Sequence, residues 1–363
     1  MSHPLTDDLL EWYDQHKRSL PWRDDRTPYG TLVSEVMLQQ TRVDTVIPYY
    51  NAFLQKFPSV DVLAAAKQDD VLAMWSGLGY YSRARNLHKA AQQIVEQGAF
   101  PNTLKEIRAL SGVGEYIAGA IGSMAFDLNV GAVDGNLHRV LSRIHCDGGD
   151  RKRMWTVIEP LLPDGRCGDF NQALMDLGSS KCKKSPDCVQ CPIQVHCKAY
   201  IEDRTTDYPV VKKKKAKKEE HYVALLLRAQ THKETLCLAQ RHSEALYGGM
   251  VEPCLVVHDT TQTLDANMWS DLNLPEGLRS VNGNKWVDRG TIIHILTHKK
   301  LHIRVLECSI STDLDIESEL LSSALEAYKT IRWYTIEERA SVGISTLATK
   351  VMEQSKNQQL SLF

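Results

Sequence analysis

Residues 110–139 read LSGVGEYIAGAIGSMAFDLNVGAVDGNLHR, and this stretch decides the fold of the chain. Gly112 and Gly114 predict a tight turn between two segments of helical composition, residues 103–109 and 116–126. Such a helix-hairpin-helix brings backbone N–H groups and a helix N-terminus to a phosphate, so it can hold a nucleic-acid backbone without reading its sequence. Taken alone, a Gly-x-Gly turn is more often an ordinary connection between helices. The DNA-binding interpretation therefore depends on the other segments of the chain.

The composition is that of a globular protein with an uneven distribution of charge. At 363 residues the chain is long enough for two or three domains, and it holds no apolar run near the length of a membrane span. The N-terminal segment MSHPLTDDLLEWYDQHKRSLPW lacks the apolar core of a signal peptide, which predicts a cytoplasmic protein without disulfides. The formal net charge is -2, but residues 181–218 hold eleven Lys or Arg against four Asp or Glu, a local charge of +7. This segment indicates either contact with nucleic acid or a solvated linker.

The sequence pattern changes from helical to alternating near residue 200. Helical patterns fill the part before it, with a first helix that ends before Pro21 and a second from about Thr31, and no strand pattern occurs there. From His221 onward the segments YVALLLRA, TLCLAQR, GTIIHILTH and LHIRVLECSI predict strands, and helical patterns follow at residues 318–328 and 344–354. The sequence therefore predicts a multidomain protein, in which an all-α domain with two lobes precedes an α+β domain. The expected boundaries are 1–204 for the helical domain, 205–220 for a basic linker, 221–350 for the α+β domain and 351–363 for the tail.

Glu35 stands inside the second of these helices, between apolar neighbours. A carboxylate flanked by a valine and a methionine either pairs with a cation or has a raised pKa, because desolvation disfavours its charged form. From this segment alone, exposure on the solvent face is the commoner outcome for a helical glutamate. Both interpretations stay open at this point.

A cluster of tyrosines and arginines follows in the segment GLGYYSRARN. Its members are Tyr80, Tyr81, Arg83 and Arg85. These residue types suit stacking on bases and contact with phosphates, and they equally suit the packing of a helix start.

Four cysteines are clustered within 16 residues as C-x5-C-x2-C-x5-C. They are Cys182, Cys188, Cys191 and Cys197. In a cytosolic protein such a cluster indicates a metal site rather than disulfides. Four thiolates serve either zinc or an iron–sulfur cluster, and the presence of only one short Cys pair is unlike the usual zinc ribbon.

Seven segments, taken in chain order, resemble the MutY-type adenine DNA glycosylases of the helix-hairpin-helix superfamily. They are LPWR at Leu20, SEVMLQQTRV at Ser34, GLGYYSRARNL at Gly77, LSGVGEYIAGAI at Leu110, VDGNLHRV at Val133, NQALMDLG at Asn171 and the four cysteines. The resemblance implies a six-helix barrel lobe and an iron–sulfur lobe that flank DNA, a [4Fe–4S] cluster on the four cysteines, and a Nudix-like domain that recognises 8-oxoguanine.

The resemblance also implies roles for single residues. Glu35 is expected to be the acid that protonates adenine N7, and Asp134 the ionised carboxylate that stabilises or transiently bonds the sugar carbon, with support from Tyr116 and Asn136. Because the adenine must leave the duplex, a base-flipping mechanism follows. The other positions expected to meet DNA are Gln40 and Tyr80, which enter the base stack, Trp22, Arg23 and Asp176 around the base pocket, and Gly112 and Gly114 in the hairpin.

Tyr116 separates this chain from its nearest relative with other chemistry, endonuclease III. That family carries a lysine nucleophile two residues after the second hairpin glycine, where this chain has a tyrosine. Without the amine, Schiff-base strand cleavage has no agent. The sequence therefore predicts a monofunctional glycosylase that removes adenine opposite 8-oxoguanine or guanine. The alternatives are an endonuclease III-like glycosylase and lyase for damaged pyrimidines, and a non-catalytic iron–sulfur protein that binds DNA.

Two features depart from the family pattern. The 8-oxoguanine recognition loop, usually Phe-Ser-His, is expected at Leu296, Thr297 and His298, where a hydroxyl and the histidine are kept but the aromatic ring is lost. The first gap between cysteines has five residues where the family usually has six.

The tail of the chain resembles the bacterial pentapeptide that binds the sliding clamp. It reads QLSLF and consists of Gln359, Leu360, Ser361, Leu362 and Phe363. Such a peptide can place leucine and phenylalanine into a preformed apolar pocket, and the alternative is a docked or frayed terminus. The expectation is a monomer in the cytoplasm, associated with the nucleoid, whose partners are mispaired duplex DNA and the clamp.

Overall fold

The computed structural model describes residues 3–24, 26–148, 150–210, 216–242, 247–257, 286–312 and 328–357. The contacts divide the chain into two compact units. The first consists of Met1–Ala65 and Asn86–Lys213, and the second of Ala66–Arg85 and Lys214–Phe363. The tail QLSLF and residues 212–215 of the lysine run lie outside the described residues. Among the described residues no helix is long and apolar enough to cross a membrane.

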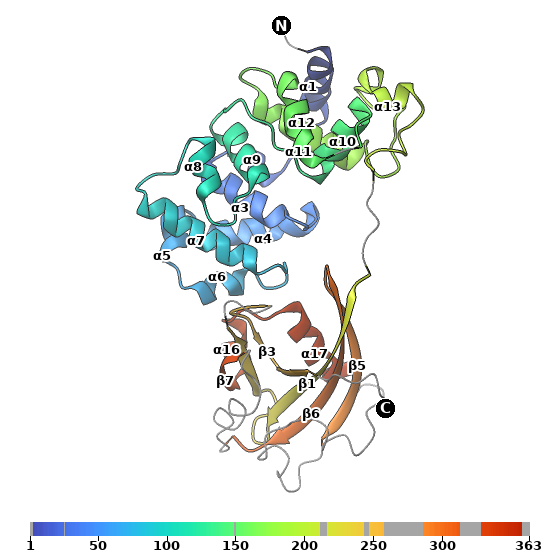
Figure 1. Ribbon diagram of the computed structural model, residues 1–363. Coiled ribbons are helices and arrows are strands. Elements are labelled where there is room, and N and C mark those ends of the chain that lie inside the picture. The colour runs from blue at the N-terminus through green and yellow to red at the C-terminus, as the bar shows by residue number, and fades with distance from the viewer. Residues whose placement is uncertain are drawn as a thin grey trace. The chain divides into compact units, whose positions relative to one another are not determined.

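The described part of the first unit is helical throughout, which confirms the expected all-α domain (Figure 1). Its helices are α1 Pro4–His16, α2 Pro21–Asp24, α3 Pro28–Leu38, α4 Val43–Lys56, α5 Val60–Ala65, α7 Ser82–Glu96, α8 Leu104–Ala109, α9 Glu115–Ala125, α10 Gly135–His145, α11 Arg151–Ile158, α12 Cys167–Ser180 and α13 Lys198–Ile201, with short 3-10 turns at Glu159–Leu161 and Gln194–His196. The first four residues of α7 belong to the second unit.

The second predicted helix begins earlier than expected. α3 starts at Pro28 rather than near Thr31, because the Thr27 side chain accepts a hydrogen bond from the backbone N–H of Gly30 and Pro28 occupies the first turn. A proline is favourable there, since the first turn has no intrahelical acceptor for its missing N–H. The extra turn brings Thr31 fully inside the helix, one turn before Glu35.

One close main-chain approach in the first unit fixes the segment that carries Asp134. The interior of this unit holds an apolar cluster to which α1, α10 and α12 contribute, for example through Leu9, Leu137 and Leu174. On α9, a Cβ added to Gly119 would lie 2.1 Å from the carbonyl oxygen of Gly131. Only glycine permits this contact. It holds α9 directly against the strand of chain that leads into α10.

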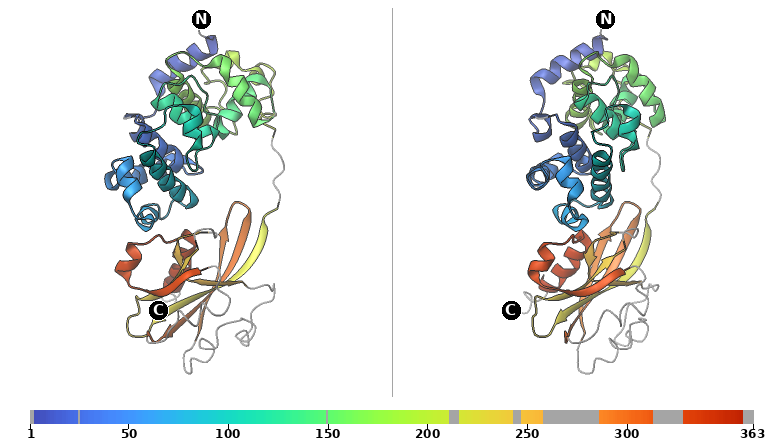
Figure 2. Two further views of the ribbon diagram at one scale, coloured as in Figure 1. Left: turned by 60° about the vertical axis from the view of Figure 1, so that its left-hand side comes forward. Right: turned by 90° about the vertical axis from the view of Figure 1, so that its left-hand side faces the viewer.

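The second unit is built on a mixed sheet whose described residues form seven strands (Figure 1). The strands are β1 Lys218–Ala229, β2 Leu236–Arg241, β3 Val251–Glu252, β4 Cys254–Val257, β5 Val287–Ile295, β6 Lys299–Ile310 and β7 Tyr328–Tyr334. The order is β3-β2-β1-β6-β5, while β4 pairs with β1 and β7 with β2. β1 and β6 are parallel, and they run side by side, yellow and orange, in both views of Figure 2. The other pairs are antiparallel.

Each face of this sheet carries its own core. Val223, Leu225 and Leu306 point to one face, and their neighbours Leu226 and Val305 point to the other. This alternation is the period of two that the sequence shows. Within its described residues the unit contains three whole helices, namely α6 Gln68–Met74, α16 Ile336–Ala340 and α17 Thr346–Asn357.

The α+β prediction is confirmed, and single elements differ from it. The four predicted strands are β1, β2, β5 and β6, of which β1 begins at Lys218 rather than His221. The helix expected at residues 344–354 is α17. The helix expected at residues 318–328 lies outside the described residues except for Tyr328, which begins β7. Strands β3, β4 and β7 and helix α16 were not predicted.

Candidate active site

Glu35 lies in the interior of the first unit and not on the solvent face of α3. Its side chain is 4% exposed, and the Tyr116 hydroxyl from α9 donates a hydrogen bond to Glu35 Oε2 at 2.5 Å. Burial raises the pKa of Glu35 to about 7, the hydrogen bond from Tyr116 acts against this rise, and the charge of Asp134 adds to it. At neutral pH a substantial fraction of this carboxyl group is protonated, as a general acid requires.

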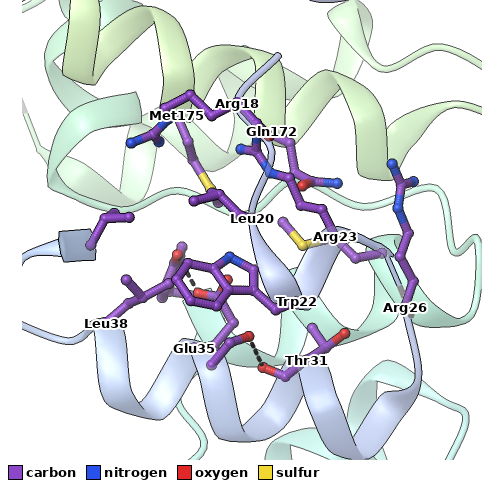
Figure 3. A pocket seen from close by; sticks show the side chains of 14 residues that line it. Arg18, Leu20, Trp22, Arg23, Arg26, Thr31, Glu35, Leu38, Gln172 and Met175 are labelled. Atoms are coloured by element: carbon purple, nitrogen blue, oxygen red, sulfur yellow. Dashed lines mark hydrogen bonds between the residues drawn. The ribbon is translucent and has the colours of Figure 1, made fainter. Parts of the chain in front are cut away.

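Glu35 borders a cavity of about 60 Å³ inside the first unit. The lining side chains are Arg18, Leu20, Trp22, Arg23, Arg26, Thr31, Ser34, Glu35, Leu38, Val43, Tyr116, Met124, Gln172 and Met175. In Figure 3 the side chains of Arg18, Gln172 and Met175 approach the cavity from the side opposite Glu35 and Thr31. The structure thus brings the predicted Trp22, Arg23, Glu35 and Tyr116 together around one space.

Asp134 caps the N-terminus of α10. Its Oδ1 accepts hydrogen bonds from the backbone N–H groups of Asn136 at 2.8 Å and Leu137 at 2.7 Å, and its Oδ2 accepts one from the Asn136 side chain at 3.0 Å. Burial raises the pKa of Asp134, while these hydrogen bonds and the Arg139 charge oppose the rise. The two carboxyl groups therefore differ in how strongly their anionic forms are stabilised, because Asp134 accepts three hydrogen bonds and Glu35 accepts one.

Asp176 forms ion pairs with two arginines that line the cavity, Arg18 and Arg23. It is 2% exposed, and it accepts hydrogen bonds from Arg18 Nε at 2.8 Å and from Arg23 Nη1 at 2.7 Å. Sequence reasoning placed Arg23 and Asp176 near the base but missed Arg18. It also missed Gln172 and Met175, although their spacing with Asp176 (i, i+3 and i+4 on α12) was a signal that all three share one helix face.

The helix-hairpin-helix is present as α8, a turn and α9. Gly112 has φ +74°, and a Cβ there would lie 2.6 Å from Asn86 Cβ, so this position requires glycine. Gly114 is the N-cap of α9 in an extended conformation, with no atom within 4 Å of where its Cβ would be. A side chain at Gly114 would therefore meet no neighbouring atom, and its backbone conformation does not require glycine.

Gln40 and Tyr80, the residues expected to enter the base stack, both have left-handed backbone. Gln40 follows α3 with φ 57° and an exposed side chain, and Tyr80 has φ 49° with 45% of its surface exposed. Such angles are uncommon outside glycine and are often found at functional positions. Tyr81 and Arg83 do not fit the expected DNA contacts, because Tyr81 donates to the Ile344 carbonyl and Arg83 is buried against the carbonyls of its own turn.

Tyr80 meets the predicted recognition loop within the second unit. The Tyr80 hydroxyl lies 2.9 Å from Thr297 Oγ1, and Leu296, Thr297 and His298 form the turn between β5 and β6. These residues line a cavity of about 520 Å³. Its other lining residues are Gly79, Tyr81, Ser82, Arg85, Tyr247, His294, Ile295, Lys299 and Thr346.

The four clustered cysteines line one small cavity in the first unit together with Arg143. Burial raises the pKa of Cys191 to about 12 and that of Cys197 above its ordinary value. The buried Arg143 guanidinium donates to Cys182 Sγ at 3.2 Å. Four sulfur donors around one space, with a cation directed at one of them, fit a metal group that binds thiolates. The other five cysteines are free thiols outside this cavity.

Helix α10 connects the cysteine loop to the Asp134 end of the site. Arg139 donates to the Cys182 carbonyl at 2.8 Å, to the Gly178 carbonyl at 2.7 Å and to Asn136 Oδ1 at 2.9 Å. Asn136 in turn bonds the Asp134 carboxylate. A continuous set of hydrogen bonds therefore runs from the first cysteine to Asp134.

Comparison with known proteins identifies both units. The model of the HhH-GPD superfamily of base excision DNA repair proteins matches residues 33–158, and that of the NUDIX domain matches residues 223–354. The chain is 32% identical to the adenine DNA glycosylase of Buchnera aphidicola (Baizongia pistaciae) over 358 residues, which cover 96% of this chain and 95% of that protein.

Two further relatives match the helical part. The mouse adenine DNA glycosylase is 47% identical over 210 residues, 53% of this chain and 41% of the mouse protein. A solved thermostable thymine-DNA glycosylase superposes with a TM-score of 0.51 and 29% identity, over 54% of this chain and 95% of its own. The chain belongs to the adenine DNA glycosylases, within the HhH-GPD superfamily of base excision DNA repair proteins.

Proposed function

We propose that this protein removes adenine mispaired with 8-oxoguanine or guanine from duplex DNA by hydrolysis of the N-glycosidic bond. The observation that carries the proposal is the buried Glu35, whose pKa is about 7, beside a cavity and in electrostatic contact with Asp134. Adenine leaves poorly as an anion, so the reaction needs a proton on the base and a negative charge near the oxocarbenium-like sugar. Glu35 delivers the proton, and Asp134 supplies the charge.

The adenine enters the cavity after it leaves the base stack of the DNA duplex. A cavity of about 60 Å³ is small beside ordinary ligand pockets of about 300 Å³ or more, so its walls move when a purine binds. Met124 and Met175 line it, and methionine side chains adapt their shape at low cost. Arg23 lines the cavity, and its ion pair with Asp176 holds this polar side chain in place.

The second unit supplies recognition of the base opposite the adenine. The Thr297 hydroxyl and His298 offer hydrogen bonds to 8-oxoguanine, and Tyr80 lies in contact with Thr297. Leu296 replaces an aromatic ring with an aliphatic side chain, so this loop relies on the hydroxyl and the imidazole. The domains proposed for these roles are residues 1–204 and 221–350, joined by the basic linker 205–220.

Single-turnover excision tests this function. With duplexes that contain A:8-oxoguanine or A:G, the wild-type protein is expected to release adenine and to leave an intact strand with an abasic site. Borohydride should trap no covalent complex, because Tyr116 stands where a lyase carries its lysine. Efficient trapping with strand cleavage would favour the endonuclease III-like alternative, and no release of adenine would favour a protein that only binds DNA.

We infer that Cys182, Cys188, Cys191 and Cys197 hold a [4Fe–4S] cluster. When bound, the cluster supplies a redox-active group and a fixed scaffold for the loop it closes. Arg143 donates a hydrogen bond to Cys182 Sγ, so a cationic side chain lies beside one of the proposed ligands. Although only five residues separate Cys182 from Cys188, all four cysteines line one cavity.

Loss of one ligand tests the cluster. The Cys197→Ser variant, purified without oxygen, is expected to lose most of its iron, its sulfide and its visible absorption. The matched control is Cys146→Ser, which changes a cysteine outside the cavity and should keep all three. Wild-type protein that contains zinc and no iron would contradict the cluster.

We propose that the tail binds the bacterial type of sliding clamp and that the protein is associated with the nucleoid. The pentapeptide from Gln359 to Phe363 presents leucine and phenylalanine in a segment short enough to bind as an extended peptide. Deletion of residues 359–363 is expected to abolish pull-down by the clamp and to leave excision from oligonucleotides unchanged. Undiminished pull-down would refute the clamp contact.

A further inference from the structure

Three side chains with metal-binding atoms lie together on the sheet of the second unit, apart from the cavities described above. They are Glu219 and His221 on β1 and His302 on β6. One possible ligand atom from each lies within 4.8 Å of the other two. Neither the cysteine loop nor the excision chemistry uses these residues.

Strand register explains why the three side chains converge. β1 and β6 are parallel, and His221 pairs directly with His302. Paired residues of neighbouring strands lie about 4.8 Å apart and point to the same face. The two imidazole rings accordingly stack with centroids 4.7 Å apart and an interplanar angle of 14°. Glu219 is two residues before His221 on the same strand and therefore shares its face.

The carboxylate already faces one of the rings. Glu219 Oε2 lies 2.9 Å from His302 Nε2, while Oε1 accepts a hydrogen bond from Lys300 Nζ at 3.1 Å. In a tetrahedral zinc site with bonds of about 2.0–2.1 Å, neighbouring ligand atoms lie about 3.3 Å apart. Glu219 Oε2 and His302 Nε2 are already closer than this value, and the other ligand atoms lie at most 4.8 Å apart, so they must approach by up to about 1.5 Å to bind one ion. Oε2 is thus the oxygen available to a cation, and Oε1 keeps its contact with Lys300.

We propose that Glu219, His221 and His302 form a zinc site in the second unit. Two imidazoles and one carboxylate are a ligand set suited to zinc, and three protein ligands leave the fourth position to water. The ordinary alternative is a polar pair of Glu219 with His302 and Lys300 that binds no metal. The proposal does not rest on the function proposed above.

The site lies at the end of the sheet that carries the recognition loop. The backbone N–H of Lys218 donates to the His298 carbonyl at 3.1 Å, and Lys217 Nζ donates to the Leu296 carbonyl at 2.7 Å. An ion that joins β1 to β6 at residues 219, 221 and 302 would hold these strand ends together. Zinc should therefore slow hydrogen exchange in residues 217–221 and 296–302.

Zinc titration of the full chain with its iron–sulfur cluster intact tests the proposal. The wild type is expected to bind one zinc ion per chain against a competing chelator, with unchanged iron content. The double variant His221→Gln/His302→Gln should lose this ion. The control His232→Gln changes an exposed histidine of the same unit outside the cluster of three and should keep it. Equal zinc binding by the double variant would overturn the site.

Two further measurements separate this site from the cysteines and from misfolding. X-ray absorption at the zinc edge should show only nitrogen and oxygen neighbours, at about 2.0–2.2 Å. Sulfur neighbours would place the ion on the cysteine loop and refute the proposal. The Lys300→Gln variant removes a positive charge beside Glu219 and should bind zinc several-fold more tightly, because an ion pair no longer competes for the carboxylate. Unchanged or weaker binding by this variant would count against Glu219 as a ligand.

Discussion

The Glu35→Gln variant is expected to release adenine about 10²–10⁴-fold more slowly than the wild type in single-turnover experiments. Glutamine keeps the size of the side chain and can still accept the hydrogen bond from Tyr116, so the pocket stays folded while the transferable proton is lost. The control is Glu11→Gln, a change of an exposed glutamate on α1 that should leave the rate unchanged. A wild-type rate in Glu35→Gln would show that Glu35 is not the proton donor.

The same residue predicts the pH dependence. Burial raises the pKa of Glu35 to about 7, and an acid works only in its protonated form. The rate should therefore fall tenfold per pH unit above pH 7, and this limb should be absent in Glu35→Gln. The raised pKa of Glu35 also makes the stability of the folded protein depend on pH. Between pH 4.5, the ordinary value, and about 7, the folded state holds a proton that the unfolded chain lacks, so stability decreases as the pH rises through this range.

The second large effect is expected for Asp134→Asn, which should slow excision by about 10²–10³-fold. Asparagine is as good an N-cap as aspartate, so its side-chain oxygen can still accept from Asn136 and Leu137 and the helix should keep its stability. The variant loses the negative charge proposed to lie near the sugar and, because an amide nitrogen replaces Oδ2, the hydrogen bond from the Asn136 side chain. Single-turnover rates and melting temperatures, measured on the same preparations, check both parts of the prediction.

Asp134→Ala separates charge from capping. Alanine removes both, and it should slow excision at least as much while it also destabilises the protein by about 1 kcal/mol. If Asp134→Asn kept the wild-type rate and only Asp134→Ala lost it, Asp134 would be a helix cap without a chemical role.

Local patterns in the sequence predict much of this fold, since helices and alternating strands carry their own periodicity. Strand β7 is an element that local periodicity does not predict. Its buried residues are Tyr328, Ile331 and Tyr334, three apart, and this spacing does not alternate. The segment is a strand because it pairs along β2, a partner distant in sequence. Pairing with a distant strand outweighs the local pattern. The two-residue strand β3 is too short to have a pattern at all.

In the candidate site, too, the sequence predicts some residues, whereas others depend on contacts between distant segments. The seven matching segments contained Glu35, Tyr116 and Asp134, but the neighbours of Glu35 on α3 could not decide whether it was buried. Its environment depends on α9, some eighty residues later, which brings Tyr116 against it. Arg18 was missed for a related reason. It lies just before a recognisable segment, and its role depends on Asp176, 158 residues away in sequence.

The contact between Gly119 and Gly131 has a consequence for the precision of the site. Here two stretches of main chain touch with no side chain between them, directly before the turn that presents Asp134. Side chains exchange rotamers on fast timescales, whereas a main-chain contact has no rotamers to exchange. The segment that leads to Asp134 is therefore positioned by a main-chain contact. Gly119 has no functional group of its own, yet replacing it with any other residue would disrupt this contact.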